Sequence, residues 1–240
     1  MKILLTLFVC VSSGQENPNS LYDGIELIYK DENESEKDFL ARAAKSAKGK
    51  YAIVCENGFK FADVQSLLNI IDKNTSDMVC FTGGSAVKIS VLKNLKDFPD
   101  AFSFKLSGVM NCKNLLKTVY TPFNFEKEKY RYSEEKSEGI LYSAETFGKV
   151  KAKLNKEIYS YAFNMLCEKL TAYYLYAILA IKDGAVPAEK LIEFDNKLKA
   201  EIVLYLALEK RFTYAKLQKL RDKQFRISFL TARKFRKIIK

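Results

Sequence analysis

The stretch that decides the fold reads A-K-G-K-Y-A-I-V-C-E-N-G and occupies residues 47–58. Its middle, Tyr51–Cys55, is an apolar run of strand length, with Gly49 before it and the polar residues 56–58 after it. A short apolar run between such breaks is typical of a strand buried on both faces of a parallel sheet. The sequence therefore predicts a sheet with helices on both sides.

The neighbouring segments alternate between strand and helix patterns. Residues 1–11 and 24–29 before this stretch, and residues 78–81 after it, are further runs of strand character. Helical patterns separate them at residues 35–47 and 62–71. Strands that alternate with helices at this spacing predict an α/β fold with a parallel or mixed sheet.

The first apolar run has two interpretations. Residues 1–11 contain one lysine before the apolar residues, as a short signal peptide would, but no small-residue cleavage site follows. A buried first strand explains the same residues, and this interpretation is preferred. No later run reaches the roughly 18 uncharged apolar residues of a spanning helix. The chain is therefore expected to be cytoplasmic.

The second half of the chain changes character. Residues 99–142 are aromatic and charged with little periodicity, and we expect loops and short strands that complete the sheet. Beyond them the pattern is helical, with a helix that ends at Gly184 and another that begins near Pro187. We therefore expect an α/β domain at 1–142 and a helical region with a basic tail at 143–240. The helical region could also form a homodimer contact.

The composition excludes several kinds of chemistry. The chain has no histidine, which removes Ser-His-Asp and Cys-His hydrolysis and most zinc or iron sites. It has five cysteines, which are scattered, form no C-x-x-C pair and are odd in number. They predict neither a disulfide framework nor a zinc knuckle.

The net charge of +11 is concentrated in the tail. Residues 210–240 carry twelve Lys or Arg against one acid, and the totals of 40 basic and 29 acidic residues then leave residues 1–209 without net charge. A basic helix with aromatic residues on its apolar side suits an anionic membrane surface. A solvated helix packed on its own domain explains the same pattern. No RNA-binding motif accompanies the charge, so a nucleic-acid partner is not predicted.

Residues 47–58 resemble family 2 glycosyltransferases, in which A-K-G-x-Y precedes a four-residue apolar strand and an Asp-x-Asp pair. The first strand, the second strand that ends in acids at Asp31, and the capped helix after it are similar in order and spacing. The resemblance covers about residues 2–95. It implies a GT-A-like α/β domain with a mixed or parallel sheet flanked by helices, here followed by the helical C-terminal region.

The resemblance also implies a donor site. In that family the Asp-x-Asp pair coordinates Mg²⁺ or Mn²⁺ bound to the diphosphate of a nucleotide sugar. A divalent cation with hard oxygen ligands neutralises the departing diphosphate. Aligned on Tyr51, the first Asp falls on Glu56 and the second on Gly58, so Glu56 is the implied metal ligand. Asn57 offers an amide oxygen to the donor, and Asp31 matches the acid that contacts the nucleobase.

The family carries its catalytic base late in the domain. The carboxylates considered for that role are Asp97, Asp100, Glu126 and Glu128, and Asp100 is the one assigned. The implied function is transfer of a sugar from a nucleotide-sugar donor to a glycan acceptor of the cell-surface polysaccharide class, at the cytoplasmic face of the membrane.

Two alternatives stay open because the Asp-x-Asp pair is incomplete. One is a catalytically inactive glycosyltransferase-fold protein that acts as a binding or membrane-associated accessory subunit. The other is an adaptor for a membrane or a nucleic acid, whose α/β half is a scaffold.

Overall fold

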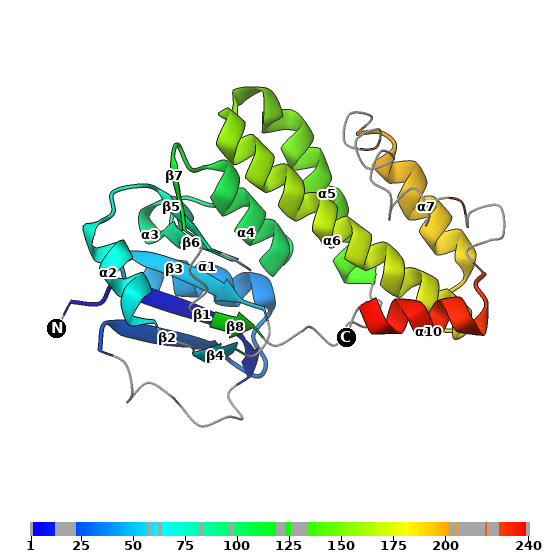
Figure 1. Cartoon of the computed structure of the whole chain (residues 1–240), viewed down its shortest axis with the longest axis horizontal. Helices are drawn as coiled ribbons and strands as arrows, with labels where there is room; N and C mark the ends of the chain where they lie inside the picture. Colours follow the sequence, from blue (N-terminus) through cyan, green and yellow to red (C-terminus); the bar gives the residue numbers. More distant parts are fainter. Residues whose placement is uncertain are drawn as a thin grey trace. The chain divides into compact units, whose positions relative to one another are not determined.

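The computed structural model describes residues 2–12, 23–56, 59–61, 64–81, 84–96, 98–118, 123–125, 134–201, 205, 219 and 226–238. It divides into two compact units, which we treat separately (Figure 1). The first contains Met1–Glu128 with Leu154–Tyr159, and the second contains Lys129–Lys153 with Ser160–Lys240. The sequence placed the boundary later, between residues 142 and 143.

The first unit is built on a six-stranded mixed sheet with the strand order β2-β1-β3-β6-β5-β7. Strands β2, β1 and β3 are parallel neighbours, β6 runs antiparallel between β3 and β5, and β7 is parallel to β5. The strands are β1 (Leu5–Ser12), β2 (Ile25–Lys30), β3 (Tyr51–Cys55), β5 (Met78–Phe81), β6 (Gly84–Lys88) and β7 (Leu115–Lys117). Two further strands, β4 (Phe59–Phe61) and β8 (Phe123–Phe125), form a separate antiparallel pair. The predicted α/β architecture with a mixed sheet is confirmed, and the first apolar run forms the strand β1 between β2 and β3.

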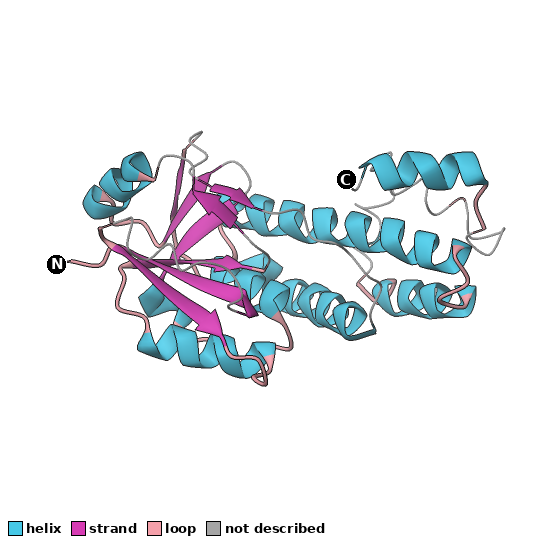
Figure 2. Ribbon diagram, turned by 90° about the horizontal axis from the view of Figure 1, so that it is seen from below, coloured by secondary structure: helices cyan, strands magenta, loops and turns pink. Residues whose placement is uncertain are grey.

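Helices cover both faces of this sheet (Figure 2). On one face, α2 (Gln65–Lys73) packs on alternate residues of β1 and β3, which form a continuous apolar core with it. On the other face, α1 (Glu36–Ser46) contacts β1 and α4 (Ala101–Met110). Phe104 of α4 lies against Phe8 of β1, with ring centroids 6.4 Å apart. The central strands are therefore covered on both sides, as parallel strands require.

The helix α4 and the start of the helix α5 (Glu134–Val150) were not expected, because residues 99–142 were predicted to be loops and short strands. Nine of the ten residues of α4 are buried, so α4 has no polar face that would show helical periodicity in the sequence. The short strands β7 and β8 do occur in this stretch. A four-residue helix, α3 (Ile89–Leu92), follows β6.

The described residues of the second unit are mainly helical. They include α5 (Glu134–Val150), a 3₁₀ turn (Lys151–Lys153), most of α6 (Lys156–Lys182), α7 (Ala188–Leu198) and α10 (Phe229–Ile238). Helix α6 ends before Gly184, whose φ of 74° is accessible to glycine at little cost, and Pro187 precedes α7, as predicted. Between these helices, buried Tyr174 donates a hydrogen bond to buried Asp195. No helix in the described ranges is long and apolar enough to cross a membrane.

Candidate functional site

The carboxyl ends of β1 and β3 mark the most favourable place for a ligand in the first unit. These strands are parallel neighbours, but the chain leaves β1 towards β2 on one side and leaves β3 towards α2 and β5 on the other. In open α/β sheets, connections that diverge in this way leave a crevice outside the carboxyl ends, where ligands bind. The residues at this edge are therefore the first candidates for function.

Glu56 follows β3 directly at this edge. Its carboxylate accepts a hydrogen bond from Lys105 Nζ of α4, with 3.0 Å between Nζ and Oε1. The Glu56 side chain is 20% exposed and that of Lys105 is 31% exposed, so water reaches both only partly. An ion pair shielded from solvent in this way is screened less than a surface pair. The pair holds the Lys105 ammonium beside the end of β3, where the Glu56 carboxylate balances its charge.

Cys10 and Glu36 complete a cluster around this ion pair. Burial raises the pKa of the Cys10 thiol, the negative charges of Glu36 and Glu56 raise it further, and Lys105 lowers it. Glu36, Glu56 and Lys105 therefore all lie within electrostatic range of Cys10, and we call these four residues the carboxyl-edge cluster. The Cys10 thiol stays protonated at neutral pH, which makes it a poor nucleophile.

The cluster is connected to the start of α4. Glu36, in the first turn of α1, accepts a hydrogen bond from the backbone N–H of Ala101, with an N–O distance of 3.0 Å. Asp100 is the N-cap of α4, and its Oδ1 accepts hydrogen bonds from the backbone N–H of Ser103 at 2.8 Å and from the Ser103 hydroxyl at 2.5 Å. Asp100, the residue assigned as the base, is therefore adjacent in sequence to Ala101, which binds Glu36 of the cluster. The Asp100 carboxylate itself binds Ser103. Its assignment as a base stays a prediction.

Asp31 lies at the same edge of the sheet as Glu56. Val9 of β1 is opposite Tyr29 on one side and opposite Cys55 on the other, so the strands β2 and β3 end at similar heights. Two strand spacings separate them, which is about 10 Å. The structure thus brings the two sequence-predicted acids to one edge, with β1 between them.

Asp31 is exposed and forms an ion pair with Arg42 of α1, with 3.6 Å between Asp31 Oδ2 and Arg42 Nη2. Arg42 also donates to both carboxylate oxygens of Glu34, at 2.8 and 2.6 Å, and to the backbone carbonyl of Tyr29 at 3.0 Å. The hydrogen bond from Arg42 lowers the pKa of Glu34. Arg42 therefore connects the end of β2 to α1, and Asp31 projects beside this junction.

The remaining predicted site residues, Asn57, Asp97, Glu126 and Glu128, lie outside the described residues. In the part of the chain that the structure describes, no three His, Cys, Asp or Glu side chains converge as a metal site would require. The Glu56 carboxylate is also bound by Lys105. The carboxylate and thiol groups of the described residues therefore do not by themselves fit a divalent cation. The metal at Glu56 stays a prediction.

The motif that carries the family resemblance has a structural role at the opposite edge of the sheet. Gly49 N–H donates to Thr6 Oγ1 at 3.1 Å, and Lys48 N–H donates to Glu26 Oε2 at 2.8 Å. Thr6 also donates to Glu26 at 2.8 Å, which closes the network. A Cβ atom at position 49 would lie 2.6 Å from Thr6 Oγ1 and 2.9 Å from Thr6 N, so only glycine fits against β1. These contacts join α1 to the sheet.

Lys50 and Tyr51 of the same motif bind the end of α2 and the residues that follow it. Lys50 Nζ donates to the carbonyls of Ile71, Asp72 and Asn74 at 2.8, 2.9 and 2.6 Å, where α2 leaves its last carbonyls without helical partners. The Tyr51 hydroxyl donates to the carbonyl of Ser76. The conformation of the motif is thus explained by packing, independently of any ligand.

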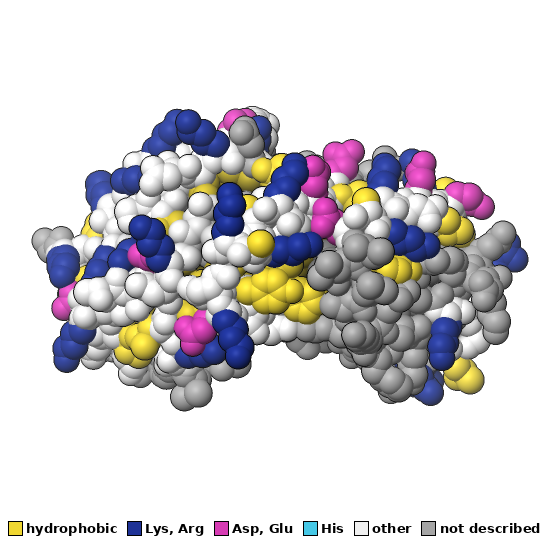
Figure 3. Space-filling view, turned by 90° about the horizontal axis from the view of Figure 1, so that it is seen from above, with side chains coloured by type: hydrophobic (Ala, Val, Ile, Leu, Met, Phe, Trp, Pro, Cys, Tyr) yellow, Lys and Arg dark blue, Asp and Glu magenta, His cyan; other side chains and the backbone are white. Residues whose placement is uncertain are grey.

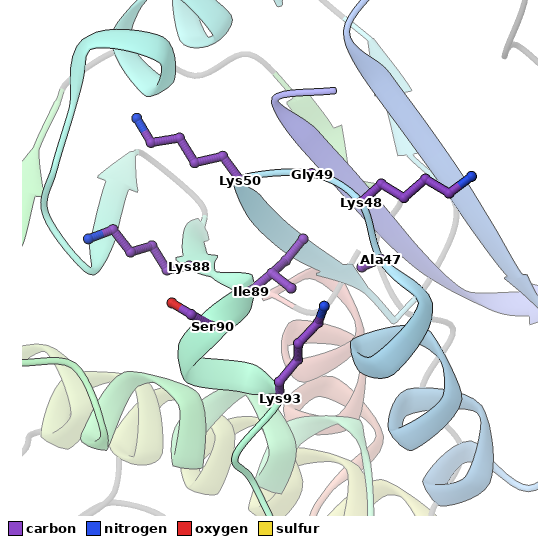
Figure 4. Close-up of a pocket in the computed structure, with 8 residues that line it drawn as sticks. All are labelled: Ala47, Lys48, Gly49, Lys50, Lys88, Ile89, Ser90 and Lys93. Carbon is purple, nitrogen blue, oxygen red and sulfur yellow. The ribbon is translucent and has the colours of Figure 1, made fainter. Parts of the chain in front are cut away.

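A cavity of about 580 Å³ lies beside the same motif (Figure 4). Its lining residues include four lysines, at positions 48, 50, 88 and 93. In Figure 4 the Lys48 and Lys50 side chains point in opposite directions. The ammonium of Lys50 serves the end of α2, and that of Lys88 donates to the carbonyl of Thr75 and to Asp77. The lysines therefore do not form a common anion site.

Sequence reasoning missed three of the four residues of the carboxyl-edge cluster. Cys10 and Glu36 belong to a strand and a helix that were expected, but nothing in the sequence indicated that they approach Glu56. Lys105 did carry a signal, because it is the one charged residue in the apolar run 101–110. A single charge within a buried helix usually has a partner.

Comparisons with known proteins add no further evidence. A scan against protein-family models, a search of curated proteins and a search of solved structures each found no match.

Proposed function

We propose that this chain is a glycosyltransferase-like protein that binds the diphosphate of a nucleotide sugar at the carboxyl ends of β1 and β3. The observation that carries this proposal is the Glu56–Lys105 ion pair at the point where the connections of β1 and β3 diverge. The order of the A-K-G-x-Y motif, the buried strand and the acid supports it, and the mixed sheet is compatible with a GT-A fold.

The Lys105 ammonium, the one cation of the cluster, suits the chemistry of sugar transfer. The bond between the anomeric carbon and the phosphate oxygen breaks, and negative charge develops on the departing diphosphate. Positive charge fixed at that position stabilises the transition state. The Lys105 ammonium supplies such a charge, and Glu56 holds it at the end of β3.

The acceptor is a glycan hydroxyl, which attacks the anomeric carbon and must lose its proton. We assign that proton to Asp100, whose carboxylate is held by Ser103 at the start of α4. The hydroxyl oxygen then forms the new glycosidic bond, and the nucleoside diphosphate leaves with the electron pair of the old bond.

A second candidate is an accessory protein that binds the nucleotide sugar without turnover. The partners of the two carboxylates favour it, since Asp100 caps α4 and Glu56 holds Lys105. Both acids would then be retained for structure and binding alone.

Paired lysine variants test the proposed binding site. Lys105→Met removes the one positive charge of the cluster, whereas Lys93→Met removes an exposed charge at the opposite edge of the sheet. We expect Lys105→Met to weaken UDP-sugar binding about tenfold or more, as loss of a charge-assisted contact does, and Lys93→Met to leave it unchanged. Equal binding of the UDP-sugar by both variants would show that the carboxyl-edge cluster is not part of the binding site.

A further inference from the structure

The helix α10 exposes two large apolar side chains. Phe229 is 70% exposed and Leu230 is 67% exposed, whereas the other exposed large hydrophobic residue in the described ranges, Leu116, reaches 38%. Both residues lie in the first turn of α10, and the basic side chains of Arg226, Arg233 and Lys234 near them are exposed too. Two adjacent apolar residues at this exposure are costly in water unless a partner covers them.

The exposed residues share one side of the helix. At 100° per residue, positions 229, 230, 233 and 234 fall within an arc of about 140°. Ala232, on the other side, is 1% exposed, and Ile227 just before the helix is 8% exposed. The arc of Phe229, Leu230, Arg233 and Lys234, which we call the α10 face, therefore combines apolar and cationic side chains and contains no acid.

One ion pair joins α10 to the chain just after α6, and a local cap begins the helix. Arg236 Nη2 donates to both carboxylate oxygens of Asp183, at 2.9 and 2.8 Å. At the start of the helix, Ser228 Oγ accepts from the backbone N–H of Thr231 at 3.2 Å. The burial of Ala232 and the exposure of Phe229 and Leu230 show which side of α10 faces outward.

We propose that the α10 face docks this protein on the surface of an anionic phospholipid bilayer. Its apolar side chains would enter the boundary between headgroups and acyl chains, and its cations would contact the phosphates and carboxylates of the lipids. The charge distribution supports this occupant, because residues 210–240 carry twelve Lys or Arg against one acid. Figure 3 shows basic side chains spread over one face of the molecule. A nucleic acid would use the cations and can stack a base on Phe229, but it offers no apolar region for Leu230.

Cosedimentation of the full chain with vesicles tests this proposal. We expect binding to vesicles of phosphatidylcholine mixed with phosphatidylserine, and little binding to phosphatidylcholine alone. The double variant Arg233→Gln with Lys234→Gln should lower the partition coefficient about 30-fold, from the usual contribution of each charge near such a surface. Its control, Lys153→Gln with Lys156→Gln, removes two exposed charges elsewhere and should bind like the unchanged protein.

The apolar part of the face has its own variant. Phe229→Ser with Leu230→Ser should lower the partition about tenfold or more, while Leu116→Ser should have no effect. Circular dichroism of each variant checks that the helices are retained. The proposal is wrong if the full chain does not sediment with anionic vesicles, or if well-folded α10 variants bind them as the unchanged protein does. Binding to RNA or to an acidic peptide without vesicle binding would also overturn it.

Discussion

Lys105 Nζ lies 3.0 Å from Glu56 Oε1, and this contact joins the middle of α4 to the end of β3. The two residues are 49 positions apart in the sequence. One face of α4 covers the sheet, so the ion pair lies where a buried helix meets the edge at which α/β proteins bind ligands. The proposed donor site rests on this position of the Glu56–Lys105 pair at the carboxyl end of β3.

Loss of Lys105 should also affect stability. Lys105→Met leaves the partly shielded Glu56 carboxylate without its closest cation, so we expect the free energy of unfolding to fall by about 1 kcal/mol. Urea denaturation measures this change, and Lys93→Met is the matched control. A Lys105→Met variant as stable as that control would mean that the ion pair contributes nothing to the fold.

Gly49 should tolerate no side chain. Gly49→Ala places a Cβ atom 2.6 Å from Thr6 Oγ1 and 2.9 Å from Thr6 N, so the end of α1 or the strand β1 must shift. We expect a loss of about 2–3 kcal/mol in the free energy of unfolding, as for other overpacked sites. Gly184→Ala is the comparison, because a Cβ there meets no atom within 4 Å and only the φ of 74° opposes it, at a cost of about 1 kcal/mol. Equal losses for both variants would contradict the close contact at Thr6.

Asp100 can be examined for its two roles separately. Asp100→Asn keeps an oxygen that can accept from Ser103, so the cap and the stability should remain, whereas Asp100→Ala should cost about 1 kcal/mol. If Asp100 is the base, Asp100→Asn should abolish turnover and retain donor binding, because an amide cannot take the proton. Thermal unfolding and a sugar-transfer assay together measure both effects. Full turnover by Asp100→Asn would show that the base is another residue.

Stability should fall at alkaline pH. Burial raises the pKa of the Cys55 thiol to about 12 from 9.0, and burial raises that of the Tyr51 hydroxyl to about 12 from 10.0. Their neutral forms are favoured in the folded state, so this contribution is complete below pH 9 and is lost as the pH rises towards 12. Unfolding in urea between pH 7 and pH 11 should show the decline, and Tyr51→Phe should reduce its slope above pH 10. A flat profile would mean that these groups are not shielded from water.

The regular parts of the fold could be predicted from the sequence, and the reasons are local. Tyr51–Cys55 is apolar on both faces and bounded by breaks, so a buried strand was the simplest interpretation, and β3 confirms it. Gly184 follows the end of α6 and has a positive φ, which glycine adopts easily, and Pro187 precedes α7. These backbone preferences are local and can be read from the sequence. Helix α4 could not be predicted in this way, because burial around its circumference removes the polar face that marks a helix.

The candidate site was only partly predictable, because it depends on pairings distant in sequence. Glu56 could be named since it follows a buried strand directly. Lys105, Glu36 and Cys10 reach it through the packing of α4 and α1 on one face of the sheet, which no local pattern encodes. The A-K-G-x-Y motif precedes the strand β3 that Glu56 follows, although the residues of the motif pack at the other end of that strand.

Calorimetric titration of the purified chain with UDP and with UDP- and GDP-sugars, with and without Mn²⁺, tests the central claim most directly. We predict binding of at least one nucleotide sugar in the micromolar range, weakened by Lys105→Met and not by Lys93→Met. Dependence on Mn²⁺ that is lost in Glu56→Gln would add the metal to the site. No binding to any of these compounds, with or without the metal, would contradict the proposed donor site.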